Sequence, residues 1–177
     1  MLSAAEHTIA MMLALSRNIP QANSSLKSKK WERKKFMGVE VNGKTLGVIG
    51  LGRIGAEVAK RAQGLEMDIL AYDPFITEER AKELGVKLRT VQEIAQEADF
   101  ITVHTPLTKE TRNIVDKAEF DMMKSNARII NCARGGIINE EALAEALNSG
   151  KIAGAAVDVF VNEPPFESPI LDCESLI

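Results

Sequence analysis

The sequence predicts an α/β domain in which helices cover both faces of a doubly wound parallel sheet. The first observation behind this prediction is that short apolar runs of strand length alternate along the chain with segments of helical spacing. The second is that these helical segments begin at capping residues, and most of them end at glycines. Strands joined by such helices pair in parallel through right-handed crossovers, so the helices lie on both faces of the sheet.

The alternation occupies residues 42–177 and starts after the turn signal Asn42-Gly43. The expected strands span residues 45–49, 68–72, 100–104, 127–132 and 153–159. The expected helices span residues 53–63, 77–85, 90–97 and 139–150. The signals that bound these helices are Thr77, the capping box from Thr90 to Glu93, and Asn139 at N-termini, with Gly64, Gly85 and Gly150 at C-termini.

Two segments precede this α/β region. Residues 1–17 predict a packing helix, in which Ser3 and Glu6 have the spacing of a capping box. The inner side of this helix is expected to carry Ile9, Met12, Leu13 and Ser16. In residues 18–41, Pro20 and a pair of serines interrupt the periodicity, so an extended basic arm is expected there.

Composition and charge exclude several classes of protein. The 177 residues are 45% hydrophobic and 27% charged, which is the balance of a globular protein with one main core. The net charge of −3 argues against a surface built for nucleic acid, and no apolar run reaches the roughly 20 residues of a membrane span. Cys132 and Cys173 lie far apart without a Cys/His cluster, so neither a disulfide framework nor a metal site is predicted. We expect a cytoplasmic protein.

The stretch GVIGLGRIG at residues 47–55 joins the first expected strand to the next helix. By itself a G-x-G-x-x-G pattern is a weak signal, because glycine is common. In this context Gly50 would permit the tight turn, Gly52 would let the backbone approach a pyrophosphate, and Gly55 would let the helix pack closely on the strand. The N-terminus of the helix would supply free N–H groups to the phosphates. The stretch therefore predicts a Rossmann-type dinucleotide-binding domain.

Asp73 stands at the end of the second expected strand, close to the spacing at which an acid binds the adenosine ribose hydroxyls. A carboxylate there would repel a 2'-phosphate, and the neighbouring residues Pro74 to Ile76 include no arginine. NAD is therefore predicted as the cofactor in preference to NADP. The alternative is that Asp73 only forms an Asx turn before Pro74.

Polar residues follow three other expected strands. They are His104-Thr105-Pro106, Cys132-Ala133-Arg134 with two glycines after it, and Asp158 followed by Glu163-Pro164. Ligands of open α/β sheets bind beyond the carboxyl ends of the strands, so we expect these residues to line one crevice.

Arg134 and Glu163 are the charged candidates for catalysis. The planar guanidinium of Arg134 suits a substrate carboxylate, while the alternative is a structural ion pair with Asp158 or Glu163. Glu163 could orient a catalytic base or could be a solvated loop acid. The spacing of these residues leaves both alternatives open.

His104 and Cys132 each have two interpretations. His104 could carry a proton or could pack against a cofactor ring, whereas His7 lies within the first helix and is assigned a structural role. Cys132 is expected to pack near the nicotinamide, because a nucleophilic thiol needs a nearby base that the sequence does not show.

The motifs GKTLGVIGLGRIG, VHTPLTKETRNIV, NCARGGIINEEAL and AAVDVFVNEPP resemble, in unbroken order, those of the D-isomer-specific 2-hydroxyacid dehydrogenases. The resemblance implies that Arg134 holds the carboxylate and hydroxyl oxygen of a small 2-hydroxy acid, and that Glu163 pairs with a catalytic histidine. It implies NAD-contacting positions at Arg53, Ile54, Asp73, Thr105, Cys132, Ala133 and Asp158. It also implies that the basic, aromatic stretch around Trp31 belongs to an arm used in a homodimer.

The sequence departs from the family pattern in one respect. The family's catalytic histidine lies in a segment of the type S-C-P-H after the next strand, whereas this chain ends at SLI, and His104 does not match that position. We therefore expect an excised cofactor-binding domain of a larger enzyme, which binds NAD and turns over poorly. A non-enzymatic alternative is an NAD-sensing module like the transcriptional corepressors that share this resemblance.

Overall fold

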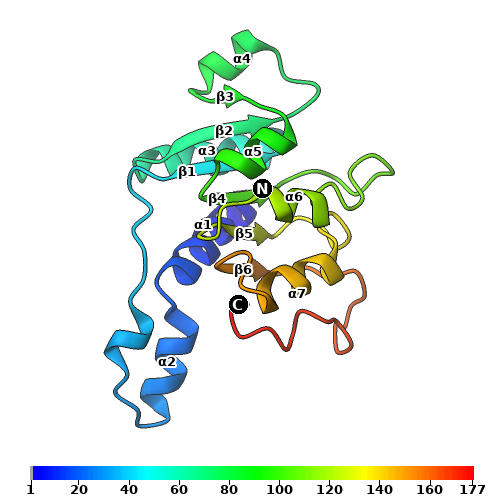
Figure 1. Cartoon of the computed structure of the whole chain (residues 1–177). Coiled ribbons are helices and arrows are strands. Elements are labelled where there is room, and N and C mark those ends of the chain that lie inside the picture. The colour runs from blue at the N-terminus through cyan, green and yellow to red at the C-terminus, as the bar shows by residue number, and fades with distance from the viewer. Residues whose placement is uncertain (1) are drawn as a thin grey trace.

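The computed structural model describes residues 2–177, which form one six-stranded sheet with helices on both faces (Figure 1). The strands are β1 (Thr45–Ile49), β2 (Asp68–Tyr72), β3 (Lys87–Leu88), β4 (Phe100–Val103), β5 (Arg128–Asn131) and β6 (Gly154–Val157). They pair in parallel in the order β3-β2-β1-β4-β5-β6, so the strand order reverses between β1 and β4. The doubly wound, Rossmann-type prediction is confirmed.

The helices are α1 (Leu2–Ser16), α2 (Ile19–Lys27), α3 (Arg53–Gly64), α4 (Glu78–Glu83), α5 (Val91–Glu97), α6 (Lys117–Met122) and α7 (Glu140–Asn148). In Figure 1, α5, α6 and α7 cover the near face of the sheet, whereas α1 and α3 lie behind it. Each face has its own apolar cluster. Along β5, Ile129 belongs to the cluster beneath α5 to α7 and Ile130 to the cluster beneath α1 and α3. Burial on both faces explains why the strands are apolar runs without polar alternation.

Local capping fixes where several helices begin. The Thr77 hydroxyl accepts a hydrogen bond from the Arg80 N–H, Thr90 and Glu93 form the expected capping box, and the Asn139 side chain accepts from the first turn of α7. The very short strand β3 and helix α6 were not predicted from the sequence. The start of α6 nevertheless carries a capping box of its own, made by Asp116 and Glu119.

Helix α1 is confirmed, but its cap and part of its inner face were predicted wrongly. Ser3 lies inside the helix, because the helix already includes Leu2. The buried residues are Ala5, Thr8, Met12, Leu15 and Ser16. Thr8 and Ser16 can be buried because their hydroxyls donate to the carbonyl oxygens four residues earlier, at 2.9 and 2.7 Å. Polar residues whose hydrogen bonds are made within the helix can therefore face the sheet.

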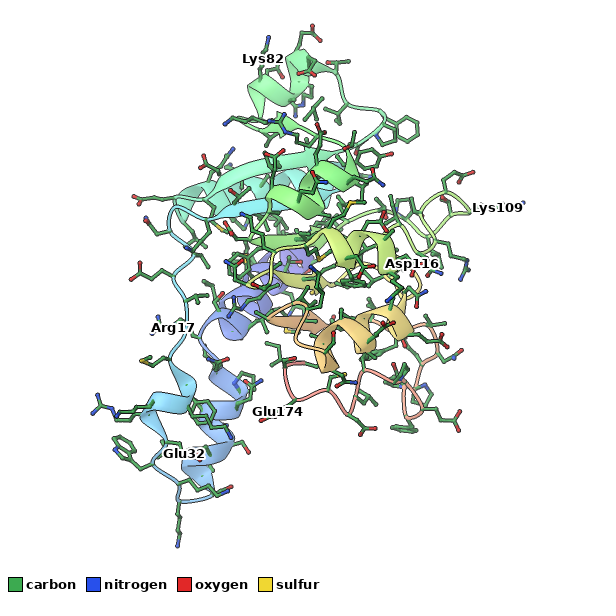
Figure 2. All side chains as sticks on the ribbon, viewed as in Figure 1. Arg17, Glu32, Lys82, Lys109, Asp116 and Glu174 are labelled. Carbon is green, nitrogen blue, oxygen red and sulfur yellow. The ribbon has the colours of Figure 1, made fainter. Side chains whose placement is uncertain are left out.

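The segment after α1 was expected to be extended, but it is largely helical. It contains α2 and a short 3-10 helix at Arg33–Phe36. Pro20 lies in the first turn of α2, where a missing N–H costs nothing, so it starts a helix instead of interrupting one. Neither helix contains a buried residue, and the segment stands away from the sheet, with Glu32 near its outer end (Figure 2). We call residues 18–37 the arm.

The last residues run beside β6. The backbone N–H of Ala155 donates to Ser175, and the N–H of Val157 donates to Ile177, at 3.1 and 2.9 Å. Among residues 2–177, no helix is long and apolar enough to cross a membrane.

Candidate functional site

The glycine loop after β1 has the geometry that the sequence predicts. Gly50 has φ +95°, and a Cβ atom there would lie 2.8 Å from the carbonyl carbon of His104. A Cβ on Gly55 would overlap the carbonyl oxygen of Gly50, so close packing of α3 on the loop requires glycine. A Cβ on Gly52 would meet nothing within 4 Å. Within residues 2–177, therefore, contacts made by the chain do not explain the glycine at 52, whereas a ligand on the backbone would.

The start of α3 fits the phosphates of a dinucleotide. Gly52 is the N-cap of this 12-residue helix and offers no capping side chain to the first N–H groups. These donors and the positive end of the helix dipole stand at the end of β1, next to the point where the strand order reverses. Arg53 and Ile54 form the first turn of α3. The loop and the helix together provide an anion site at the topological switch point.

Asp73 lies directly against this loop. Its Oδ2 accepts a hydrogen bond from the Leu51 N–H at 2.8 Å, and its Oδ1 accepts from the Phe75 N–H at 2.9 Å. The Asx turn considered as an alternative therefore does form. It does not exclude the cofactor role, because each carboxylate oxygen has a second lone pair for a ribose hydroxyl. Pro74, which follows, is exposed.

The loops after β4 and β5 meet α1 and α3 around a cavity of about 450 Å³. Its lining consists of Ala4, Ile54, His104, Thr105, Pro106, Leu107, Cys132, Ala133 and Arg134. The structure thus brings together the residues that the sequence placed after two different strands. The hydroxyl oxygen of Thr105 is buried, and no described residue makes a hydrogen bond to it. An unpaired buried hydroxyl at this place fits a polar group of a bound cofactor.

His104 and Cys132 are poor candidates for proton transfer or nucleophilic attack. Burial lowers the pKa of His104 to about 4, and its Nε2 lies 3.0 Å from the Thr102 hydroxyl, so the ring is neutral at pH 7. Burial raises the pKa of the Cys132 thiol to about 11. Both side chains therefore suit packing beside a cofactor, which was one of the two interpretations for each residue.

Arg134 is exposed at the rim of the 450 Å³ cavity, and its Nη1 donates to the Ala133 carbonyl at 2.7 Å. Among the residues that the structure describes, it forms no ion pair with Asp158 or Glu163, so the structural alternative for Arg134 is not supported. The guanidinium keeps donors for a carboxylate ligand.

Asn131, which the sequence analysis missed, holds the loop that carries Arg134. Its Nδ2 donates to the Arg134 carbonyl and its Oδ1 accepts from the Ala133 N–H, both at 3.0 Å. The side chain is 3% exposed. A polar residue directly after two buried isoleucines of a strand was the available signal, because such a residue must find partners when buried.

The loops after β5 and β6 are joined at Phe160. The backbone of Gly135 packs against the backbone of Phe160 so closely that a Cβ on Gly135 would overlap it. The Phe160 N–H in turn donates to Glu163 Oε1 at 3.2 Å. Arg134 and Glu163 thus come from adjoining loops, although Glu163 is exposed and does not line the 450 Å³ cavity.

Asp158 follows β6, and His7 of α1 reaches it across the rim of the sheet. The Nε2 of His7 lies 3.4 Å from Asp158 Oδ1. His7 was expected to be structural; its contact with Asp158 arises because α1 packs across β5 and β6, which the sequence does not show.

A second cavity, of about 710 Å³, lies between the start of α7 and the loop at 161–169. Glu140, Glu141 and Glu167 line it against a single cation, Arg112, so its net charge is unfavourable for a carboxylate or a phosphate. The smaller cavity therefore remains the better candidate, because it gathers the strand-end residues and adjoins the glycine loop. No group of three or more potential metal ligands occurs within residues 2–177.

Comparison with known proteins identifies the family. Residues 9–177 match the profile described as D-isomer specific 2-hydroxyacid dehydrogenase, NAD binding domain. The D-3-phosphoglycerate dehydrogenase of Archaeoglobus fulgidus is 54% identical over 177 residues, which are 99% of this chain and 34% of that protein. The human enzyme of the same name is 52% identical over 176 residues, 99% of this chain and 33% of that protein. The chain thus spans about a third of the length of the curated relatives it matches.

Solved structures agree with this family. The D-lactate dehydrogenase of Salmonella has a TM-score of 0.86 and 37% identity, and the match covers 93% of this chain and 50% of that one. The D-lactate dehydrogenase of Aquifex aeolicus, in complex with NAD and lactic acid, has a TM-score of 0.85 and 36% identity, over 92% of this chain and 49% of that one. The chain therefore belongs to the D-isomer-specific 2-hydroxyacid dehydrogenase family, in which it is the NAD-binding domain.

Proposed function

We propose that the chain is the NAD-binding domain of a D-3-phosphoglycerate dehydrogenase, which oxidises 3-phospho-D-glycerate to 3-phosphohydroxypyruvate in the first step of L-serine biosynthesis. The observation that supports this most is the 52 to 55% identity over nearly the whole chain to relatives with that name. Three D-lactate dehydrogenases of known structure are 35 to 37% identical. The stretch KKWERKKFMGVEVNGKTLG at 29–47 also resembles phosphoglycerate dehydrogenase.

The proposed roles follow the arrangement of the strand ends. The N-terminus of α3 and Gly52 would hold the pyrophosphate, and Asp73 would hold the adenosine ribose. Thr105 and Cys132 would contact the cofactor from the loops after β4 and β5. NAD, when bound, supplies the hydride acceptor.

Arg134 and Glu163 would serve the substrate side. Arg134 would hold the carboxylate and the hydroxyl oxygen with its guanidinium fork. Glu163 would orient the histidine that removes the hydroxyl proton, and would stabilise the positive charge of that histidine once it is protonated. Neither His7 nor His104 lies in a segment of the S-C-P-H type, and His104 is neutral and half-buried. We therefore expect residues 1–177 to bind NAD without turning over substrate.

The arm would mediate a homodimer. Leu26, Trp31 and Met37 are 59, 76 and 78% exposed, and apolar side chains gathered on a projecting segment suit a second copy of the same chain. Sedimentation should show a dimer, and the double substitution Trp31→Ser with Met37→Ser should shift it to monomer. A monomeric parent chain at high concentration would contradict this part of the proposal.

Two alternatives remain for the whole protein. One is another D-2-hydroxyacid dehydrogenase of the glyoxylate, hydroxypyruvate or D-lactate type. This alternative has less support, because the D-lactate dehydrogenase of Salmonella is 37% identical to the chain, against 54% for the phosphoglycerate dehydrogenase of Archaeoglobus fulgidus. The other is a corepressor-like NAD sensor. Arg134 and Glu163 do not separate an enzyme from such a sensor, so the full-length protein must be assayed with 3-phosphoglycerate.

We also propose a cytoplasmic location. The two free cysteines, Cys132 and Cys173, support this proposal.

The test of cofactor binding is a calorimetric titration of the chain with NAD, NADH and NADP in parallel. Saturable binding of NAD and NADH, with much weaker binding of NADP, is expected, because Asp73 would repel a 2'-phosphate. A folded sample that binds none of the three at millimolar concentration would contradict the proposed function.

A further inference from the structure

His7 is held at the rim of the site by its own helix. The neighbouring residues Ala5 and Thr8 are buried, and α1 packs on both β5 and β6. The imidazole itself is 46% exposed, and its Nε2 lies 3.4 Å from Asp158 Oδ1, which is longer than a usual hydrogen bond. The contact is therefore an attraction between a donor on α1 and an acceptor that follows β6.

Asp158 has little else to fix its carboxylate. Its backbone N–H donates to the Asn131 carbonyl at 3.0 Å, which anchors the main chain. Within the part of the chain that the structure describes, His7 is the only basic side chain within 4 Å of this carboxylate, and no side chain donates a hydrogen bond to it at closer range. The position of the carboxylate thus depends on His7 more than on any other side chain described.

The order of the strands indicates which end of the cofactor Asp158 faces. Asp73 follows β2 and the glycine loop follows β1, whereas Asp158 follows β6, four places from β2 in the sheet. At a strand spacing of about 4.8 Å, these two acids stand about 19 Å apart across the sheet. With the adenosine ribose at Asp73 and the pyrophosphate at the loop, the nicotinamide half must extend over β4 to β6.

We propose that His7 is a positioning residue, which holds Asp158 toward the nicotinamide half of the cofactor. This inference rests on the proposed NAD binding and adds a specificity element to it. With Nε2 of His7 facing Oδ1, the second oxygen of Asp158 is left to accept a hydrogen bond from an amide donor. The carboxamide of nicotinamide is such a donor, whereas the adenosine half lies at the opposite end of the cofactor, near Asp73.

The experiment compares NAD with ADP-ribose, which has the adenosine, the pyrophosphate and the second ribose but no nicotinamide. Both ligands are titrated into the parent chain and into His7→Ala by calorimetry. The variant should bind NAD about two- to fivefold more weakly, as expected for the loss of one partly exposed polar contact, and should bind ADP-ribose unchanged. His7→Gln, which keeps a side-chain N–H donor, should recover most of the NAD affinity.

Two controls separate this role from a structural one. Glu6→Ala changes the adjacent residue of α1, whose carboxylate faces Arg61 at 3.9 Å, and should leave both affinities unchanged. In an Asp158→Ala background, His7→Ala should cause no further loss of NAD affinity, because its partner is gone.

Several outcomes would overturn the inference. His7→Ala could lower the affinities for NAD and ADP-ribose equally, leave both unchanged, or still weaken NAD binding in the Asp158→Ala background. Absence of NAD binding by the parent chain is a different result, which would contradict the proposed function itself.

Discussion

The loops after β1 and after β5 both place glycines at the carboxyl end of a central strand, but for different physical reasons. After β1, Gly50 and Gly55 satisfy local backbone requirements, while a Cβ on Gly52 would meet nothing. After β5, Gly135 is required because the backbone of Phe160 lies against it. The first loop is thus shaped for what binds to it, and the second is shaped by the next loop of the chain.

The side chains follow the same division. Asp73 contacts the first loop through Oδ2 and the Phe75 N–H through Oδ1, and each oxygen can accept another hydrogen bond. In the second loop, Asn131 uses its amide to fix the backbone at Ala133 and Arg134. A substitution of Gly52 should therefore change binding more than stability, and one in the second loop should change stability first.

The largest expected effect compares Gly135→Ala with Gly52→Ala. Gly135→Ala should lower the free energy of unfolding by about 3 kcal/mol, because the new methyl group overlaps backbone that cannot rotate away. Gly52→Ala, at φ −67° with open space around it, should leave stability nearly unchanged and weaken NAD binding. Urea denaturation and calorimetric titration measure the two effects. Equal stability of the two variants would remove the distinction between the loops.

His104, which lies between the two loops, gives a pH dependence of stability. Its pKa is about 4 in the folded chain against about 6.5 unfolded, so the unfolded state binds more protons between these values. The contribution of His104 to the free energy of unfolding should be fully present above about pH 6.5, and the free energy of unfolding should fall by about 2 to 3 kcal/mol as the pH drops to 4. Denaturation of His104→Gln at pH 7 and pH 4.5 should show a smaller loss than the parent chain, and an identical loss would contradict the assignment.

Asn131→Ala should destabilise the second loop. The substitution leaves the Ala133 N–H and the Arg134 carbonyl without their partners, at a cost of about 2 kcal/mol in the free energy of unfolding. Asn162→Ala, the same substitution at an exposed loop position, is the control and should change stability little. If the two variants unfold at the same urea concentration, Asn131 does not organise the loop.

The smallest expected effect is on cofactor choice. Asp73→Ala should lower NAD affinity about tenfold and narrow the difference between NAD and NADP, because the carboxylate near the ribose is lost. The parallel titration of both cofactors measures this change. Unchanged affinity for both cofactors would mean that Asp73 lies outside the site and serves only to form its Asx turn.

The fold could be predicted where local rules decide. Thr77 and Thr90 cap their helices as the sequence indicates, and the apolar runs form the strands within one or two residues. Pro20 was misinterpreted because the same residue both ends helices and begins them. β3 has two residues and α6 has six, so neither is long enough to produce a clear periodicity.

The site could be predicted only as a set of strand ends. The role of Gly55 follows from local spacing, since its contact with Gly50 lies within one loop, whereas the close contact of Gly50 is with His104 of another loop. The low pKa of His104 depends on burial, and the contact between His7 and Asp158 depends on where α1 packs. These properties arise between elements that are distant in sequence, so no short stretch of sequence contains them.

The arm has a consequence for the continuity of the chain. It follows α1 and contains no buried residue in its helices, whereas α1 is seated on the sheet by Ala5, Met12 and Leu15. A protease cut within the arm should therefore leave a two-piece protein in which α1 stays bound without a covalent link. If a second copy covers the arm, cleavage should slow as the protein concentration rises, so the rate of nicking becomes a measure of self-association.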